Sequence, residues 1–204
     1  GAGRTEIGRA ICGIDYIDSG DVYVEGKKVK ITSPKDALHA GIAYLSEDRK
    51  QEGLVLKSSV RWNLSMANMH NTLSMGMVNL KKDEKIAGEM IEAMQIKTPT
   101  KEQYVMNLSG GNQQKIVIGK WLNTNAKVFI FDEPTRGIDV GAKYEIYLLM
   151  NQLVKEGKSI IMISSEMPEV LEMSDRVLVV NKGKITADLT GNDKNAQTVM
   201  EYAI

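Results

Sequence analysis

The chain has 204 residues, of which 43% are hydrophobic and 25% are charged, a composition typical of one globular domain with a packed core. Lysine and arginine together number 26, as do aspartate and glutamate, and this balance argues against a domain that binds nucleic acid through its phosphates. A single cysteine, Cys12, excludes an internal disulfide and fits a reducing compartment. No stretch reaches the roughly 18 apolar residues of a membrane span, and no secretory leader is visible, so any work at a membrane would need a partner.

The first residues, Gly1 to Glu6, read as the second half of a phosphate-binding loop with the pattern G-x-x-x-x-G-K-[ST]. In this register Gly3 is the last glycine, Arg4 takes the place of the lysine, and Thr5 supplies the hydroxyl for Mg²⁺. The start of the motif and the strand that feeds it would lie before residue 1, so we expect the chain to be a fragment. Arginine is larger and forked where the loop needs a compact cation, and Glu6 adds negative charge, so nucleotide binding is expected here without efficient hydrolysis.

The elements that follow are short. Up to residue 57 we expect a helix over 5–13, a hairpin over 20–31 that turns at Gly26-Lys27, a helix from Ser33 to Gly41, a buried strand over 42–45, and a polar connector over 47–57. The hairpin is indicated by the alternation of Val22 and Val24 before the turn. Ser33 followed by Pro34 is typical of a capped helix start.

From about residue 58 to 107 strand signals vanish, and helical patterns appear at 59–69 and 81–95. Methionines concentrate in this part of the chain: Met66, Met69, Met75, Met77, Met90, Met94 and Met106. Most of them are expected to fill the core, and a minority could form an adaptable apolar groove for a partner helix.

Two stretches between residues 108 and 139 carry the chemistry. Ser109 and the turn Gly110-Gly111 open a helix, and a helix N-terminus offers unpaired N–H groups and partial positive charge to a phosphate. The apolar run 128–131 then ends in Asp132 and Glu133, at the carboxyl end of a buried strand, where open parallel sheets place their ligands. Asp132 suits Mg²⁺, which prefers oxygen ligands and phosphate.

The last part of the chain returns to alternating helices and strands. We expect a long helix over 140–156, a strand over 159–164, a helix over 166–174, a strand over 175–180, a turn at 181–184 and a closing helix over about 193–203. Two continuous apolar strands joined by a helix predict a βαβ unit in a parallel sheet that is covered on both faces.

These motifs, in this order and spacing, resemble the ATP-binding-cassette family. LSGGNQQ, at residues 108–114, is similar to its signature motif, VFIFDEP to its Walker B strand, and GID to its D-loop. SEDRK, DEPTRGIDVGAK and SSEMPEVLEMSDR resemble more closely the second cassette of fused, two-cassette ATPases from ribose-, galactose- and xylose-type sugar importers. The resemblance implies a P-loop α/β fold with a parallel core sheet, flanking helices, an antiparallel hairpin subdomain and a helical subdomain at about 58–120, all within one domain over 1–204.

The resemblance also implies roles for individual residues. ATP and Mg²⁺ are the implied cofactors, with Thr5 and Asp132 on the metal and Glu133 and Ser165 as catalytic residues. The implied nucleotide-binding residues are Gly1, Ala2, Gly3, Arg4, Thr5, Glu6, Glu47, Ser109, Gly110, Gly111, Asn112, Asp132 and Asp139. Glu47 stands where the family has a glutamine and Ser165 where it has a switch histidine. Three departures, at residues 4, 47 and 165, therefore fall on the chain's own ATP site, while the signature is intact.

The implied partners are a first cassette in the same polypeptide or a second copy, integral membrane permease subunits and, indirectly, a sugar-binding protein. The implied location is the cytoplasmic face of the plasma membrane, with no nucleic acid bound. Replacing Gly111 by Asp should then abolish transport, by aiming a carboxylate at the partner's γ-phosphate. Two alternatives stay open: a soluble ABC-type ATPase that acts on nucleic acid or the ribosome, and a regulatory module without turnover, which Arg4 and Ser165 favour locally.

Overall fold

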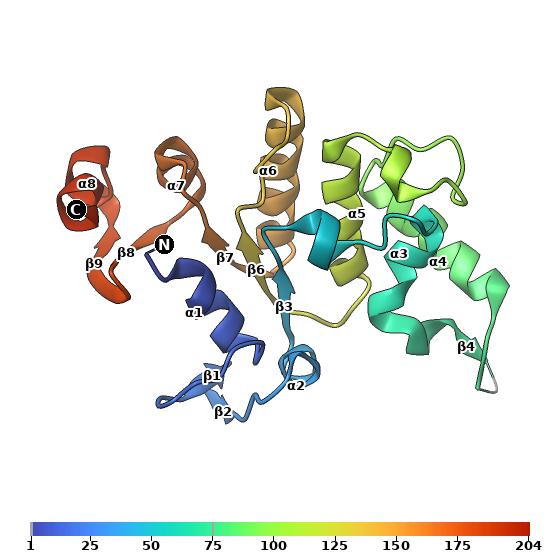
Figure 1. Cartoon of the computed structure of the whole chain (residues 1–204), viewed down its shortest axis with the longest axis horizontal. Coiled ribbons are helices and arrows are strands. Elements are labelled where there is room, and N and C mark those ends of the chain that lie inside the picture. Colours follow the sequence, from blue (N-terminus) through green and yellow to red (C-terminus); the bar gives the residue numbers. More distant parts are fainter. Residues whose placement is uncertain (1, 75) are drawn as a thin grey trace.

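A three-stranded parallel sheet occupies the middle of the molecule (Figure 1). The structure is a computed structural model that describes residues 2–74 and 76–204. The strands are β3 (Ile42–Leu45), β6 (Val128–Asp132) and β7 (Ser159–Ile163), in the order β3-β6-β7. Asp132, the last residue of β6, pairs in register with Ile163 of β7, so both strands end at the same edge of the sheet. The parallel pairing of β6 and β7 confirms the predicted βαβ arrangement.

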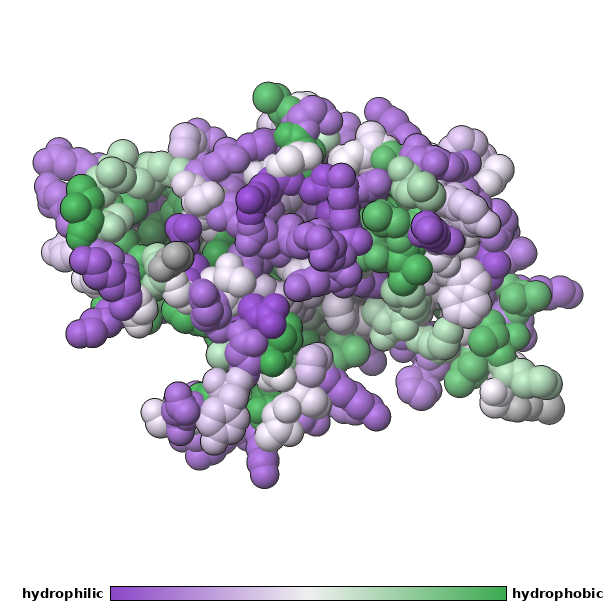
Figure 2. All heavy atoms as spheres, in the orientation of Figure 1, coloured by the Kyte–Doolittle hydropathy of each residue, from purple (hydrophilic) through white to green (hydrophobic). Residues whose placement is uncertain are grey.

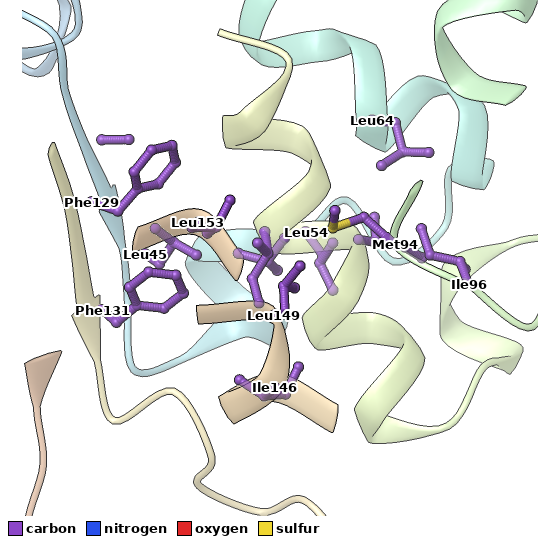
Figure 3. Packing of buried hydrophobic residues seen from close by; sticks show 14 of the residues in the cluster. Leu45, Leu54, Leu64, Met94, Ile96, Phe129, Phe131, Ile146, Leu149 and Leu153 are labelled. Carbon is purple, nitrogen blue, oxygen red and sulfur yellow. The ribbon is translucent and has the colours of Figure 1, made fainter. Parts of the chain in front are cut away.

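The sheet is covered on both faces because its strands are apolar on both faces. Phe129 and Phe131 of β6 pack into the larger hydrophobic cluster with Leu149 and Leu153, as Figure 3 shows. Ile130, between them, faces the opposite side and packs with residues of the N-terminal helices and hairpin. This alternation within a continuous apolar run is what a doubly covered parallel strand requires.

The N-terminal elements cover one face of the sheet. They are α1 (Arg4–Ile11), β1 (Val22–Val24), β2 (Lys27–Val29) and α2 (Pro34–His39). Ser33 caps α2 as expected, because its side chain accepts from the N–H of Asp36. The predicted turn residues of the hairpin were wrong by one position. Glu25 and Gly26 form the turn, both with positive φ (51° and 75°), the geometry of a tight turn that twists with its strands.

The middle of the chain is mostly helical and shares the core of the sheet. After a π-helical turn at Arg49–Gly53, it comprises α3 (Val60–Ser65), the 3-10 segments Met66–Thr72 and Val105–Asn107, α4 (Leu80–Ala93) and α5 (Gly110–Leu122). Two short strands, β4 (Leu73–Ser74) and β5 (Met77–Val78), pair as a hairpin within this helical part. The expectation that strands vanish over 58–107 was therefore wrong at this point. One hydrophobic cluster joins these helices to β3 and β6 through α5.

The methionines do less of this packing than expected. Of those in the helical part that the structure describes, Met94 is buried at 7% exposure, whereas Met69, Met77 and Met106 are exposed. Met75 lies outside the described residues. The apolar interior is filled instead by shorter aliphatic residues such as Val60, Leu64 and Val105, which fix fewer rotatable bonds on burial.

The C-terminal elements are α6 (Val140–Lys155), which covers the sheet, then α7 (Met167–Met173), β8 (Arg176–Asn181), β9 (Lys184–Thr190), the 3-10 turn Gly191–Asp193 and α8 (Ala196–Ala203). Of these, α6 packs in the same hydrophobic cluster as α5 and β6, whereas the later ones lie on the opposite side of the sheet from α3 and α4 (Figure 1). β8 and β9 pair with one another as a hairpin. Across the described residues, no helix combines the length and apolar character needed to cross a bilayer.

Candidate nucleotide site

The site is centred on the edge of the sheet where the parallel strands end. Asp132, the last residue of β6, is 1% exposed, and its Oδ1 accepts a hydrogen bond from the hydroxyl of Thr5 at 3.3 Å. Thr5 lies in the first turn of α1, 127 residues earlier in the chain. A hydroxyl and one carboxylate in contact suit Mg²⁺, which commonly binds one or two carboxylates and fills its remaining positions with phosphate oxygens and water.

Tyr44 is a member of this site that we did not single out from the sequence. Its hydroxyl donates to Oδ2 of Asp132 at 2.7 Å, so both carboxylate oxygens are held. Burial, reinforced by the Asp132 carboxylate, raises the pKa of Tyr44 above its usual value and keeps the hydroxyl protonated as a donor. The signal was available, because a tyrosine inside a buried strand usually brings its hydroxyl to a polar partner.

The opening residues lead into the N-terminus of α1. Gly3 is its N-cap with φ 98°, a left-handed conformation that favours glycine. The carbonyl of Ala2 accepts from the N–H of Gly183, and Glu6 is exposed in the first turn. Gly1, predicted to bind nucleotide, lies outside the described residues.

Arg4 is turned toward β7. Its Nη1 donates to the backbone carbonyl of Ser164 at 3.0 Å, immediately after the end of that strand. A lysine at this position would carry one compact ammonium, whereas the guanidinium can reach a carbonyl while its other donors remain available. The positive charge that a phosphate-binding loop needs, here that of Arg4, is therefore partly taken up by a hydrogen bond within the chain.

The two predicted catalytic residues lie at neighbouring strand ends. Glu133 is half-buried with φ 46°, and its N–H donates to the carbonyl of Ile163 at 2.8 Å. A positive φ is uncommon for a residue with a side chain and is often found at functional sites. Ser165 is exposed, next to Ser164, whose hydroxyl binds the buried carboxylate of Glu169.

Glu47 does not project freely into the site. Its carboxylate forms an ion pair with Arg136, in the loop that follows β6. Both residues border a pocket of about 460 Å³ beside Thr5 and Tyr44, and its other lining residues are Arg9, Asp48, Arg49, Lys50 and Glu52. Figure 2 shows hydrophilic residues over the middle of the molecule, and in the same orientation Figure 1 shows the segment that follows β3 crossing this area. The pocket is thus charged, with both signs present.

The signature residues form the capped start of α5. The hydroxyl oxygen of Ser109 accepts twice from Asn112, from its backbone N–H at 3.4 Å and from its side-chain amide at 3.0 Å. Asn112 also accepts from the N–H of Lys97, which ties the helix start to the preceding loop. α5 has 13 residues, enough for an N-terminus that favours an anion through its unpaired N–H groups.

Gly111 is buried against the next helix. A Cβ on Gly111 would lie 2.6 Å from the Cβ of Ala142, in the first turn of α6. The side chain of Asp139 caps α6 by accepting a hydrogen bond from the N–H of Ala142 at 2.9 Å. A side chain at residue 111 would therefore also clash inside this chain, so loss of transport in Gly111→Asp would not by itself identify an effect on a partner's phosphate.

Comparison with known proteins supplies the family. A model described as "ABC transporter" matches residues 1–136. The ribose import ATP-binding protein RbsA of Oceanobacillus iheyensis is 52% identical over 203 residues, covering 100% of this chain and 41% of that protein. RbsA of Bacillus subtilis is 44% identical with the same coverage. The chain thus spans about two fifths of the length of these relatives.

The fold is similar to solved cassettes. A nucleotide-free ATP-binding cassette from an ABC transporter superposes with a TM-score of 0.80 at 22% identity, over 98% of this chain and 80% of the other. The dimeric post-hydrolysis state of the cassette MJ0796, bound to ADP and Pi, gives a TM-score of 0.76 at 17% identity, over 93% of this chain and 81% of that chain. With the fold, the strand-end site and the family model in agreement, this chain belongs to the ABC transporter family.

Proposed function

We propose that the chain is the nucleotide-binding domain of a sugar importer, which binds ATP with Mg²⁺ and couples its hydrolysis to carbohydrate uptake. The observation that carries the proposal is the contact of Thr5 with Asp132 at the carboxyl edge of the sheet, because this pair can hold the metal of a nucleotide. The sugar-import names of relatives at 44–52% identity support the class of cargo. We also propose one domain over 1–204 with a helical subdomain at about 58–120, and the hydrophobic cluster shared by the helical part and the sheet supports placing those two parts in it.

In this proposal each residue at the strand ends has a separate task. Thr5 and Asp132 hold Mg²⁺, and Tyr44 keeps the Asp132 carboxylate oriented. Mg²⁺, when bound, supplies positive charge that stabilises the transferring phosphoryl group. Glu133 orients the attacking water or accepts its proton, and Ser165, exposed after the next strand end, is the second catalytic residue of the proposal. Gly3 and the first N–H groups of α1 approach the phosphates through the backbone.

The chain's own site is proposed to bind ATP but to turn it over slowly. Arg4 is engaged by the carbonyl of Ser164, and Glu47 by Arg136, so two of the three substituted positions are partly occupied within the chain. The signature, by contrast, presents a capped helix N-terminus. Ser109, Gly110, Gly111 and Asn112 are therefore proposed to complete a competent site whose phosphate-binding loop lies on another cassette.

That other cassette is proposed to be the first cassette of the same polypeptide or a second copy of this one. Integral membrane permease subunits would receive the conformational change, and a sugar-binding protein would deliver the cargo to them. This places the domain at the cytoplasmic face of the plasma membrane, as a peripheral subunit that binds no nucleic acid. The balanced charge of the chain supports the last point.

The first test is ATP turnover by the intact transporter carrying Glu133→Gln. If the chain's own site is a nucleotide clamp, turnover should stay near the unaltered level. A loss of most turnover would instead mean that this site hydrolyses ATP at a working rate. In either case the variant keeps the shape of the side chain and removes only its negative charge.

A second test addresses the signature and uses Ser109→Asp with Ser109→Asn as its matched control. Asp, Asn and Ser are comparably good helix caps, so α5 should keep its start in both variants. Only Asp places a negative charge where a phosphate would bind. We expect Ser109→Asp to abolish turnover and Ser109→Asn to keep most of it, and equal activity of the two would contradict the signature-donor role.

A further inference from the structure

Arg49 joins three segments that are far apart in the sequence. It lies in the π-helical turn after β3, and its Nη1 donates to the carbonyl of Arg136 at 2.8 Å. Its Nη2 donates to the carbonyl of Gly137 at 3.2 Å. The same Nη2 also lies against the signature, because a Cβ on Gly110 would be 2.9 Å from it.

The contact has the geometry of a specific clamp. Two nitrogens of one planar guanidinium hold two successive carbonyl oxygens, an arrangement that the single ammonium of lysine cannot reproduce. The Nε of Arg49 is buried without a hydrogen-bond partner among the described residues, so this nitrogen has lost its water to reach its position. An arginine that merely lay on the surface would keep its Nε in water.

The loop over 136–139, which Arg49 contacts, is also held by the residues on either side of these hydrogen bonds. Glu47, two residues before Arg49, forms an ion pair with the side chain of Arg136, so the connector contacts this loop twice. The loop leads to Asp139, which caps α6 at Ala142. Ala142 in turn packs on Gly111. The two signature glycines are thus supported separately, Gly110 by Arg49 and Gly111 by the start of α6.

We propose, resting on the function proposed above, that Arg49 is a positioning residue for the signature. It holds the start of α5 and the 136–139 loop in the arrangement that another cassette's ATP requires. It also makes that arrangement depend on the connector, which borders this chain's own pocket next to Thr5. A conformational change in the connector over 47–57 would therefore move the guanidinium of Arg49 and, with it, the start of α5 at Gly110.

The test compares Arg49→Ala and Arg49→Lys in the intact transporter, with Arg176→Ala as a matched control. Arg176 also makes a two-pronged contact, to Asp188 on β9, but lies outside the site. We expect both Arg49 variants to lower kcat for ATP by about tenfold or more, with KM changed less than about twofold, because binding at the phosphate loops is untouched. The control should match the unaltered protein. Unchanged kcat in Arg49→Lys would overturn the proposal.

A second readout does not depend on turnover. Amide hydrogen exchange of residues 109–112 and 136–139 should become faster in both Arg49 variants and stay unchanged in Arg176→Ala. If the unaltered transporter shows no ATP turnover, the proposed function fails, but faster exchange in both segments would still support the clamp. Exchange in residues 109–112 that stays at the unaltered rate would overturn it, whatever the turnover.

Discussion

Arg4 donates a hydrogen bond from Nη1 to the backbone carbonyl of Ser164 at 3.0 Å, across 160 residues of sequence. The position that should offer a free cation to a phosphate is thus held by the segment that carries Ser165. Replacing Arg4 by Lys would release this carbonyl and place a compact ammonium in the loop.

We therefore expect Arg4→Lys to tighten ATP binding at the chain's own site by about tenfold, or ~1.4 kcal/mol. Titration of the intact protein with a fluorescent ATP analogue measures this directly. Arg176→Lys, the same exchange at the exposed pair with Asp188, serves as the control. Unchanged affinity in Arg4→Lys would show that the Ser164 contact does not compete with phosphate.

Tyr44→Phe removes one of the two donors to Asp132. The buried carboxylate would lose the hydrogen bond at 2.7 Å while keeping that from Thr5. We expect a loss of about 1–3 kcal/mol in the free energy of unfolding, because an acceptor oxygen is left unsatisfied in the interior. Mg²⁺-dependent ATP binding should weaken as well, whereas stability unchanged in urea titration would contradict the role of Tyr44.

Gly111→Ala tests the packing of the signature on α6. The added Cβ would lie 2.6 Å from that of Ala142, so one of the helices must shift. We expect a loss of about 1–3 kcal/mol of stability. The double variant Gly111→Ala with Ala142→Gly exchanges the two sizes across the contact and should regain most of it. If the double variant is no more stable than Gly111→Ala, the clash is not the cause.

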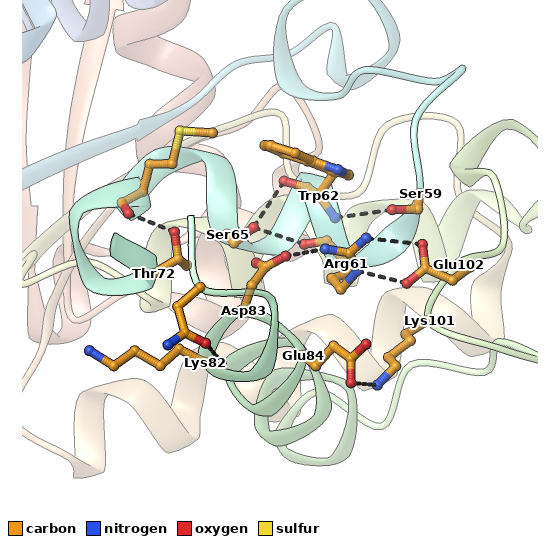
Figure 4. Close-up of polar contacts among 12 residues, drawn as sticks. Ser59, Arg61, Trp62, Ser65, Thr72, Lys82, Asp83, Glu84, Lys101 and Glu102 are labelled. Carbon is orange, nitrogen blue, oxygen red and sulfur yellow. Dashed lines mark hydrogen bonds and ion pairs between the residues drawn. The ribbon is translucent and has the colours of Figure 1, made fainter. Parts of the chain in front are cut away.

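Arg61 is the centre of a partly buried ion network in the helical part (Figure 4). It forms ion pairs with Asp83, which is 1% exposed, and with Glu102 at 2.7 Å. Its hydrogen bonds to Glu102, and then the one to Asp83, raise the pKa of Arg61. We expect Arg61→Met to cost about 3–5 kcal/mol, because it leaves the Asp83 charge buried and uncompensated.

The control for this network is the double variant Arg61→Met with Asp83→Leu, which removes both charges. It should recover most of the lost stability in thermal or urea unfolding, since the isolated charge causes the loss. Glu102→Gln, at a more exposed partner, should cost less than Arg61→Met. A double variant as unstable as Arg61→Met would point to lost packing instead.

Lys120 predicts a pH dependence of stability. Its Nζ donates to the carbonyl of Gly53 at 2.5 Å, and burial lowers its pKa from 10.5 to about 8. The unfolded chain therefore binds more protons than the folded chain between these two pKa values, and the free energy of unfolding rises with pH across that window. The rise should amount to roughly 3 kcal/mol and be absent in Lys120→Met. Equal slopes in both proteins would refute it.

The sequence by itself determined the order and type of most elements and the identity of the strand-end residues. Continuous apolar runs mark β3, β6 and β7 because a doubly covered strand must be apolar on both faces. Ser33 and Ser109 mark helix starts because their side chains accept from nearby N–H groups. Such signals are local, so they can be read without knowing the fold. The exact turn at Glu25 and the short β4–β5 hairpin, where local preferences are weak, could not be read in this way.

Only the tertiary structure decided what these residues contact. The carbonyl that accepts from Arg4 is 160 residues away, and the Tyr44 hydroxyl that donates to Asp132 is 88 residues away. The guanidinium beside Gly110 belongs to Arg49, about 61 residues earlier in the chain. No local pattern encodes such partners, since they follow from how strands and helices pack. The substituted positions 4 and 47 could be named from the sequence, but their engagement by Ser164 and Arg136 follows from the packing of the strand ends and the loops after them.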